Sequence, residues 1–395
     1  MKNKITKLLT LLLAVAAMAA IVASCDRAED PKEEPAKTTA AATTAATTAK
    51  PTVYEEQTLN VSEHLDDVFR TLGRTYTKSD KRLYVDFSCS GIHFVADCEG
   101  SVQIQLFADR NNRFTVYVDG ERMSSEPVVT ASNSGNYITV ATKLERGVHE
   151  FRIVNQTQFI WSQGAIGSVK ITGEFREKPA ERELFLEFYG DSIVNGSNVR
   201  MNGGGFDKTD ATQAFAWVTA EKMNADMNLV GCSSIGLTKN SRNFFMKDLI
   251  EWSGAHCSAY AADKNTSLVT TGIPKYDFAR VPDAVIIEQG VNDGSNASTA
   301  AFKTALTDMI NTLRQKYGKD VPIVVLTGYT SSGAYNTSIP TIISDLGGEG
   351  ANLYVCKLSN AAASKDIGGD GTHPNIESSK KMGDEISAFL EKILK

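Results

Sequence analysis

The sequence has few cysteines and no excess of basic residues. Six cysteines in 395 residues, with no Cys-x-x-Cys pair, neither form a disulfide scaffold nor indicate structural zinc. The formal net charge of -6 offers no basic face, which argues against nucleic-acid binding. No P-loop Gly-Lys-Ser/Thr or Gly-x-Gly-x-x-Gly follows a predicted strand, which argues against nucleotide chemistry. Gly-x-Ser-x-Gly is also absent, which excludes the nucleophile elbow of the α/β-hydrolases.

What is present is the composition of a folded protein. The chain is 42% hydrophobic and 22% charged, and its length predicts two or three domains. At the amino end, three lysines precede an apolar run over residues 8–22, which is too short for an ordinary membrane span and suits a signal peptide over residues 1–24.

The end of this run resembles a lipobox. Val22-Ala23-Ser24-Cys25 is similar to the bacterial lipoprotein motif, in which the cysteine is diacylated and becomes the mature amino terminus. We therefore expect Cys25 to be a lipid anchor that holds an exported protein at the bacterial cell surface or envelope, with no other membrane contact. The alternative is an ordinary signal peptide that leaves Cys25 as a free thiol.

Three further segments follow from composition and periodicity. Residues 25–52 are rich in Thr and Ala, cannot bury a core, and predict an extended tether of at most ~90 Å. Residues 53–180 contain short alternating runs without helices between them, which predicts an all-β sandwich of jelly-roll type with an accessory role. These runs are 83–87, 102–106, 114–118, 137–140 and 149–154, with Asp119-Gly120 as a tight turn.

Residues 181–395 alternate apolar strands with amphipathic helices. The strands are predicted at 184–189, 227–230, 284–288, 323–326 and 353–356. One helix carries an apolar stripe from Phe302 to Tyr317 and stops at Gly318, and a last helix carries one from Met382 to Ile393. This pattern predicts an α/β fold: a flavodoxin-like domain of three layers around a parallel sheet.

Residues that follow the predicted strands suggest a catalytic site, because open α/β sheets bind ligands beyond the carboxyl ends of their strands. A serine hydroxyl needs a base to remove its proton, and the base needs a group that fixes its tautomer. Ser192, His373 and Asp370 can fill these roles, because the short spacing of Asp370 and His373 favours a local pair. The backbone amides of Ser192 and Gly236 and the side chain of Asn292 are candidate donors to an oxyanion.

These motifs resemble a known superfamily. Gly190-Asp191-Ser192, a glycine after the second strand, Gly-x-Asn-Asp ending at Asp293, and Asp-x-x-His ending at His373 are similar, in this order, to the four blocks of the SGNH (GDSL) hydrolases. The resemblance covers residues 183–395. It implies Ser192 as nucleophile, His373 as base, and Gly236 and Asn292 in an oxyanion hole.

The resemblance extends to carbohydrate esterase family 2, because a predicted jelly roll precedes the hydrolase blocks, with 144–149 and the Gly164–Gly167 junction as matching segments. Those enzymes remove acetyl groups from plant polysaccharides such as xylan. Two departures leave roles open. The superfamily usually has glycine after the serine of block two, where this chain has Ser233-Ser234, so Gly231 is a rival donor. Some members of family 2 lack the triad acid, which leaves the role of Asp370 less secure.

Other candidate residues have ordinary structural explanations. His256 is the rival base, but it has no carboxylate at triad spacing, and Asp366 is a rival to Asp370. Trp217 is expected in the core, whereas Trp252 is a candidate platform for sugar rings. Cys232 and Cys257 could form a bridge, although buried free thiols are the expectation for the cysteines after Cys25, which are Cys89, Cys98, Cys232, Cys257 and Cys356.

The sequence therefore predicts a serine esterase at the cell surface that needs no metal and no cofactor. Its expected substrate is acetylated polysaccharide or oligosaccharide, attacked through an acyl-enzyme. One alternative keeps the same residues and changes the substrate to a lipid, a thioester, or the acetyl esters of peptidoglycan or sialic acid. A second alternative is a tethered glycan-binding protein without activity.

Overall fold

The computed structural model describes residues 53–123, 128–130, 134–200, 206–238, 242–258, 266–294, 297–330, 333–359 and 372–395. The predicted signal peptide, the tether and Cys25 lie outside the described residues, as do Asp366 and Asp370. Among the described residues, no helix has the length and apolar character needed to cross a membrane.

The first part of the chain is all-β. Ten strands form one sheet among the described residues, and every pair in it is antiparallel. The apolar faces of its strands enclose one buried cluster around Phe69, Phe94 and Phe151. The strands are β1 (Glu56–Asn60), β2 (Arg70–Leu72), β3 (Tyr76–Thr77), β4 (Leu83–Tyr84), β5 (Gly91–Ala108), β6 (Asn112–Val118), β7 (Glu121–Arg122), β8 (Val128–Thr130), β9 (Tyr137–Asn155) and β10 (Gly164–Phe175).

The predicted turn at Asp119-Gly120 is present between β6 and β7, with φ angles of 52° and 83°. The strand boundaries differ from the prediction, because the runs at 137–140 and 149–154 belong to the single long strand β9. The polar residues between these runs stay in the ladder with β5, through register shifts near Gly100, so a bulge takes the place of the expected loop. The finer assignment as a jelly roll remains a prediction.

The second part contains the predicted parallel sheet. Its strands are β11 (Leu184–Gly190), β12 (Ala225–Gly231), β15 (Ala284–Glu288), β16 (Ile323–Thr327) and β17 (Leu353–Lys357), in the order β12-β11-β15-β16-β17. All four strand pairs are parallel, and the order is that of the flavodoxin-like fold. The predicted α/β class is confirmed. A separate small sheet pairs β13 (His256–Cys257) with β14 (Leu268–Val269).

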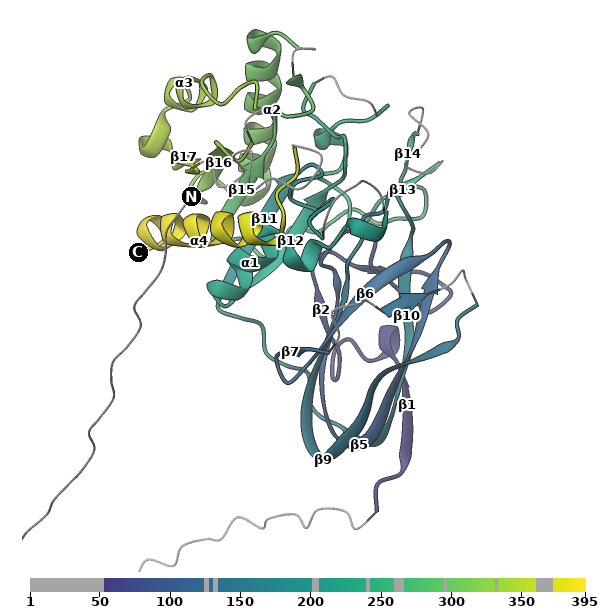
Figure 1. The fold of residues 1–395 in the computed structure, drawn as a ribbon. Coiled ribbons are helices and arrows are strands. Elements are labelled where there is room, and N and C mark those ends of the chain that lie inside the picture. Colours follow the sequence, from purple (N-terminus) through teal and green to yellow (C-terminus); the bar gives the residue numbers. More distant parts are fainter. Residues whose placement is uncertain are drawn as a thin grey trace, which may run out of the picture. The chain divides into compact units, whose positions relative to one another are not determined.

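Helices cover both faces of the parallel sheet, as Figure 1 shows. Alternate strand residues divide between two buried clusters: α1 (Phe215–Lys222) and α4 (Ile376–Ile393) pack into one, and α2 (Thr299–Tyr317) and α3 (Ile339–Asp345) pack into the other. The stripe from Phe302 to Tyr317 is buried as predicted, and Gly318 ends α2 with φ 88°. Short helical turns lie at Val61–Glu63, Phe206–Lys208, Ala211–Gln213, Met246–Asp248 and Gly348–Ala351.

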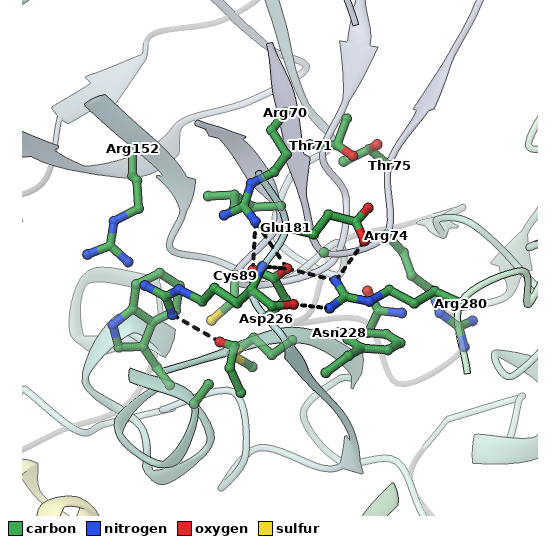
Figure 2. A pocket seen from close by; sticks show the side chains of 18 of the residues that line it. Arg70, Thr71, Arg74, Thr75, Cys89, Arg152, Glu181, Asp226, Asn228 and Arg280 are labelled. Atoms are coloured by element: carbon green, nitrogen blue, oxygen red, sulfur yellow. Dashed lines mark hydrogen bonds and ion pairs between the residues drawn. The ribbon is translucent and has the colours of Figure 1, made fainter. Parts of the chain in front are cut away.

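A cavity of about 300 Å³ lies at the amino ends of β11 and β12 (Figure 2). Residues of both parts of the chain line it. Arg70 and Arg152 from the antiparallel sheet form ion pairs with Asp226 and Glu221 of the second part, at 3.0 and 2.7 Å. Ser192 follows the opposite, carboxyl end of β11, so this cavity is not where the predicted catalytic residues meet.

Candidate active site

Ser192 and His373 meet at the carboxyl end of the parallel sheet. The Ser192 Oγ lies 2.7 Å from the His373 Nε2, although the two residues are 181 positions apart. Ser192 lies directly after the carboxyl end of β11, and His373 lies just before α4. The Asn375 side chain caps the first turn of α4 by accepting a hydrogen bond from the Ser378 amide at 2.8 Å. At this distance the ring nitrogen can take the proton of the serine hydroxyl.

The other nitrogen of His373 lies close to a residue that the sequence did not suggest. The Asn198 Nδ2 is 3.4 Å from the His373 Nδ1, and Asn198 is buried with φ 60°. The predicted acid Asp370 lies outside the described residues, so its role remains a prediction. No sequence pattern marks Asn198, because it lies in an irregular segment between β11 and α1.

Behind Ser192, two carboxyl groups are buried together. Asp191 accepts hydrogen bonds from the Ile193 amide at 2.9 Å and from the Asn292 Nδ2 at 2.7 Å. Its own amide donates to the Glu288 Oε2 at 3.0 Å. Burial raises the pKa of Asp191 to about 6, and burial beside Asp191 raises the pKa of Glu288 well above its ordinary value. Because Asp191 accepts more hydrogen bonds, we assign the negative charge to Asp191 and the proton to Glu288.

The side chain of Asn292 links this carboxyl pair to the loop after β12. Its Nδ2 donates to the Asp191 Oδ2 and, at 2.9 Å, to the Ile235 carbonyl oxygen. To stabilise an oxyanion, the amide must share or release one of these contacts. A hydrogen bond therefore links Asn292 to Asp191, the residue directly before Ser192. The role of Asn292 as an oxyanion donor stays a prediction.

The glycines proposed as oxyanion donors have close neighbours. A Cβ on Gly236 would lie 2.9 Å from the Asp293 Oδ2, and a Cβ on Gly231 would lie 2.1 Å from the Gly190 carbonyl oxygen. Both positions therefore need glycine for packing alone, and their catalytic role remains a prediction. Ser234 has φ 65°, in the left-handed region that favours glycine. Although this chain has Ser234 where block two of the superfamily usually has glycine, the backbone at Ser234 keeps the conformation of a glycine position. The Ser234 amide is therefore a further candidate donor.

The all-β part also reaches this site. The Ser88 Oγ donates to the Asn195 Oδ1 at 2.7 Å, and the Asn195 Nδ2 donates to the Asp191 carbonyl oxygen at 2.7 Å. Gln158, on the loop after β9, contacts Ser197 and Ser233. Sequence reasoning missed these residues, because nothing in an alternating strand pattern marks a polar residue that contacts another domain.

The remaining histidines lie elsewhere. Each of the four contacts a carboxylate: His64 with Asp67, His93 with Glu150, His149 with Asp119, and His256 with Asp109. His256, the rival base, lies 3.7 Å from the Asp109 carboxylate in the small sheet β13–β14. The structure therefore brings His373, and not His256, to Ser192.

The cysteines and tryptophans pack in the interior of the protein or against other side chains. The five cysteines after Cys25 are buried and free, so Cys232 and Cys257 do not form a bridge. Trp217 is buried in the core, as predicted. Trp252 packs partly buried against an aromatic cluster, and the Lys275 ammonium lies 3.7 Å from its ring centroid, which covers that face. Among the described residues, no group of three or more His, Cys, Asp or Glu side chains could hold a metal ion.

Comparison with known proteins gives two matches to family models. A model described as GDSL-like lipase/acylhydrolase matches residues 186–386. A second model, described as carbohydrate esterase 2 N-terminal, matches residues 71–179. The two matches cover the parallel and the antiparallel part in turn.

The relatives that cover most of the chain include a curated protein and several solved structures. The cellulase/esterase CelE of Acetivibrio thermocellus is 25% identical over 74% of this chain, which spans only about a third (35%) of that protein. An acetyl xylan esterase, Est2A, from Butyrivibrio proteoclasticus is 20% identical, with a TM-score of 0.72 over 86% of this chain and 99% of that chain. A family two carbohydrate esterase from Clostridium thermocellum in complex with cellohexaose is 20% identical, with a TM-score of 0.70 over 82% and 99% of the two chains.

Proposed function

The chain belongs to the GDSL-like lipase/acylhydrolase family, and from this premise we propose that it is a serine esterase that removes acetyl groups from carbohydrate. Family membership confirms the predicted enzyme class, a carboxylic ester hydrolase. The observation that carries the proposal is the 2.7 Å contact between the Ser192 Oγ and the His373 Nε2. This contact supplies the nucleophile and base that acyl transfer requires.

The proposed reaction proceeds in two steps. In the first, the Ser192 Oγ attacks the ester carbon while the His373 Nε2 takes its proton, and the imidazolium then returns that proton to the departing sugar oxygen. The product is an acetyl ester on Ser192. In the second step His373 takes a proton from water, the hydroxide attacks this ester, and acetate leaves as Ser192 regains its proton. The proposed donors to the oxyanion are the side chain of Asn292 and the backbone amides of Ser192 and Gly236, with the Ser234 amide as a further candidate.

The proposed substrate is O-acetylated polysaccharide, such as xylan or a similar plant glycan. The match of residues 71–179 to the carbohydrate esterase 2 N-terminal model supports it. Similarity to proteins named cellulase/esterase and acetyl xylan esterase, and to one bound to cellohexaose, supports it as well.

Acetate release tests the proposal. We expect the purified protein to release acetate from acetylated xylan, and Ser192→Ala to abolish release while the unfolding midpoint stays near that of the wild type. Acetylated mannan and peptidoglycan are the comparison substrates. A Ser192→Ala protein that releases acetate at the wild-type rate would remove the mechanism. Retention of polysaccharide without acetate release by the wild type would support a binding protein instead.

Acyl-chain preference tests the substrate class. A small acyl pocket should favour acetyl over butyryl esters, because each extra methylene must find space in the site. Faster turnover of long acyl chains would instead point to lipid esters, with the same Ser192 and His373.

We propose as well that the protein is exported and lipid-anchored through Cys25 at the bacterial cell surface or envelope. The basic residues, the short apolar run and Val22-Ala23-Ser24-Cys25 support this. Expressed in a bacterium, the wild type should fractionate with membranes, and Cys25→Ala should abolish lipid labelling. Equal labelling of the two proteins would contradict the anchor.

A further inference from the structure

A glutamine of the antiparallel part is built into the candidate active site. Gln158 lies on the loop that follows β9, and its side chain is fully buried. Its Nε2 donates to the Ser197 Oγ at 2.9 Å and to the Ser233 Oγ at 2.8 Å, and its Oε1 accepts from the Ser233 amide at 2.6 Å. Both hydrogens and the oxygen of the amide therefore bind segments of the parallel part.

The two serines belong to the two loops that surround Ser192. Ser197 follows the nucleophile, and its amide donates to the Ser192 carbonyl oxygen at 2.9 Å. Ser233 begins the turn after β12, and the two hydroxyl oxygens lie 2.8 Å apart. One side chain thus ties the nucleophile loop to the loop of the candidate oxyanion donors.

The loop after β12 is also held at its far end, where the Met246 amide donates to the Gly236 carbonyl oxygen at 3.1 Å and the Leu237 amide donates to the Asp293 Oδ2 at 3.1 Å. Two contacts lie closer to Ser234. The Arg242 Nε donates to the Ser233 carbonyl oxygen at 3.2 Å, and the Asn292 Nδ2 donates to the Ile235 carbonyl oxygen at 2.9 Å. Between these two contacts, Ser234 holds its φ of 65°. A non-glycine residue keeps such a conformation only where its surroundings fix it, and the Ser233 amide held by Gln158 is the contact immediately before it.

Gln158 itself is held firmly. The Asn155 Nδ2, at the start of its loop, donates to the Val85 carbonyl oxygen at 2.6 Å, and the Ala211 amide donates to the Gln156 carbonyl oxygen at 3.2 Å. The ring of Phe159 packs edge to face on Phe87, with 5.8 Å between centroids. The glutamine is therefore a rigid support and not a mobile surface side chain.

We propose that Gln158 is a positioning residue of the esterase site: by holding the Ser233 amide, it fixes the Ser233–Ile235 turn at the place from which the Ser234 amide acts on the oxyanion. This inference rests on the proposed esterase function. Its consequence is that the antiparallel part is a component of the active site and not only an accessory module. Preorganised donors act only when they cannot move away as charge develops, so a looser turn lowers kcat more than it changes KM.

The test replaces Gln158 with methionine, which has a similar length and no polar amide. We expect Gln158→Met to lower kcat for an acetyl ester by roughly ten- to a hundredfold, with KM changed by less than about threefold. The acidic limb of the pH profile should not move, because the substitution neither adds nor removes a titratable group. Hydrogen exchange measured by mass spectrometry should be faster over residues 227–237 than in the wild type.

Gln163→Met is the matched control. It removes an amide from the same connection between β9 and β10, but the Gln163 Nε2 binds the Tyr76 hydroxyl at 3.0 Å, away from the two serine loops. It should keep the wild-type kcat and the wild-type exchange over residues 227–237. A loss of kcat shared equally by both variants would overturn the proposal, because it would show a general effect of loosening the antiparallel part.

Gln158→Glu adds a second variant that keeps an acceptor for the Ser233 amide. It should keep the turn as protected as in the wild type, with a kcat above that of Gln158→Met, and it decides the question if Gln158→Met does not fold. A folded Gln158 variant with an unprotected turn and full activity would overturn the proposal. A wild type that hydrolyses no acetyl ester would instead overturn the esterase function and the catalytic role of Gln158 together.

Discussion

The protonation states of Asp191 and Glu288 determine the charge that lies next to Ser192 in the sequence and in the fold. Both side chains are fully buried, and two adjacent charges there would repel each other in a poorly solvated place. Glu288 resolves this by holding a proton, which leaves Asp191 as a carboxylate that can orient Asn292. Asp191 therefore carries the negative charge next to Ser192, because Glu288 holds the proton.

Replacing Glu288 with glutamine should make the protein more stable at alkaline pH relative to the wild type. A carboxyl whose folded pKa is raised contributes stability that is complete below its ordinary pKa of 4.5 and is lost as the pH rises through the raised value. Glutamine copies the protonated form and cannot ionise. The free energies of unfolding of Glu288→Gln and wild type, measured between about pH 5 and about pH 9, should diverge in favour of the variant.

Glu251→Gln is the control for this pH series. Glu251 is partly exposed beside Lys316 and Lys275, and hydrogen bonds and charge from these lysines lower its pKa. A lowered carboxyl pKa contributes stability that is complete above the ordinary value of 4.5 and is lost as the pH falls through the lowered value, so between about pH 5 and about pH 9 the free energies of unfolding of Glu251→Gln and wild type should differ by a constant amount. Parallel slopes for the two variants would show that Glu288 is not protonated.

At the scale of elements, the loop after β12, which contacts the Ser192 loop through Ser233 and Ser197, carries backbone strain. Ser234 adopts φ 65°, which costs a residue with a Cβ roughly 1–2 kcal/mol. Ser234→Gly should remove this strain but increase the entropy of the unfolded chain by a similar amount, so we expect stability within about 1 kcal/mol of the wild type and retained activity.

Ser234→Val places a β-branched side chain at the same φ. We expect it to cost about 2 kcal/mol or more in the free energy of unfolding and to lower kcat, because the turn must change its shape to accept the side chain. Denaturant unfolding and ester hydrolysis of both variants check this. Equal behaviour of the glycine and valine variants would mean that the left-handed conformation is not required.

Periodicity predicted the elements whose burial follows a simple repeat. The buried stripe of α2 and the five parallel strands were predictable, because each buries one regular face. Ser192 and His373 were predictable together, because each follows or precedes an element that ends at one edge of the sheet. The bulged strands β5 and β9 were not, since a bulge keeps polar residues in the ladder. Gln158 was not either, because its role depends on how two domains meet.

At the scale of the whole molecule, a buried ion pair crosses between the two parts. Arg74 lies between β2 and β3, and its guanidinium binds the Glu187 carboxylate in the middle of β11 at 2.7 Å, with both side chains fully buried. Figure 2 shows Arg74 among the charged residues that line the cavity between the parts. Its other nitrogen donates to the Ile250 carbonyl oxygen at 2.6 Å, and its guanidinium lies 3.9 Å from the ring centroid of Tyr276.

Arg74→Met should therefore strongly weaken the interface between the antiparallel and the parallel part. It leaves the Glu187 carboxylate buried without its cation, which costs about 3–5 kcal/mol, although the hydroxyls of Tyr189 and Tyr317 still donate to that carboxylate. The double variant Arg74→Met with Glu187→Gln removes the unpaired charge and should recover a large part of the loss. Urea unfolding of the wild type, both single variants and the double variant measures the coupling.

Lys275→Met separates this effect from a general loss of charge. Lys275 pairs with Glu251 at 3.1 Å, but the side chains are 56% and 43% exposed, so water screens the pair and its loss should cost less than about 1 kcal/mol. Arg74 and Gln158 both bind the parallel part from the antiparallel part. If this interface holds the candidate active site in place, Arg74→Met should also lower kcat. A stability loss for Arg74→Met no larger than that for Lys275→Met would show that the buried ion pair does not stabilise the interface between the two parts.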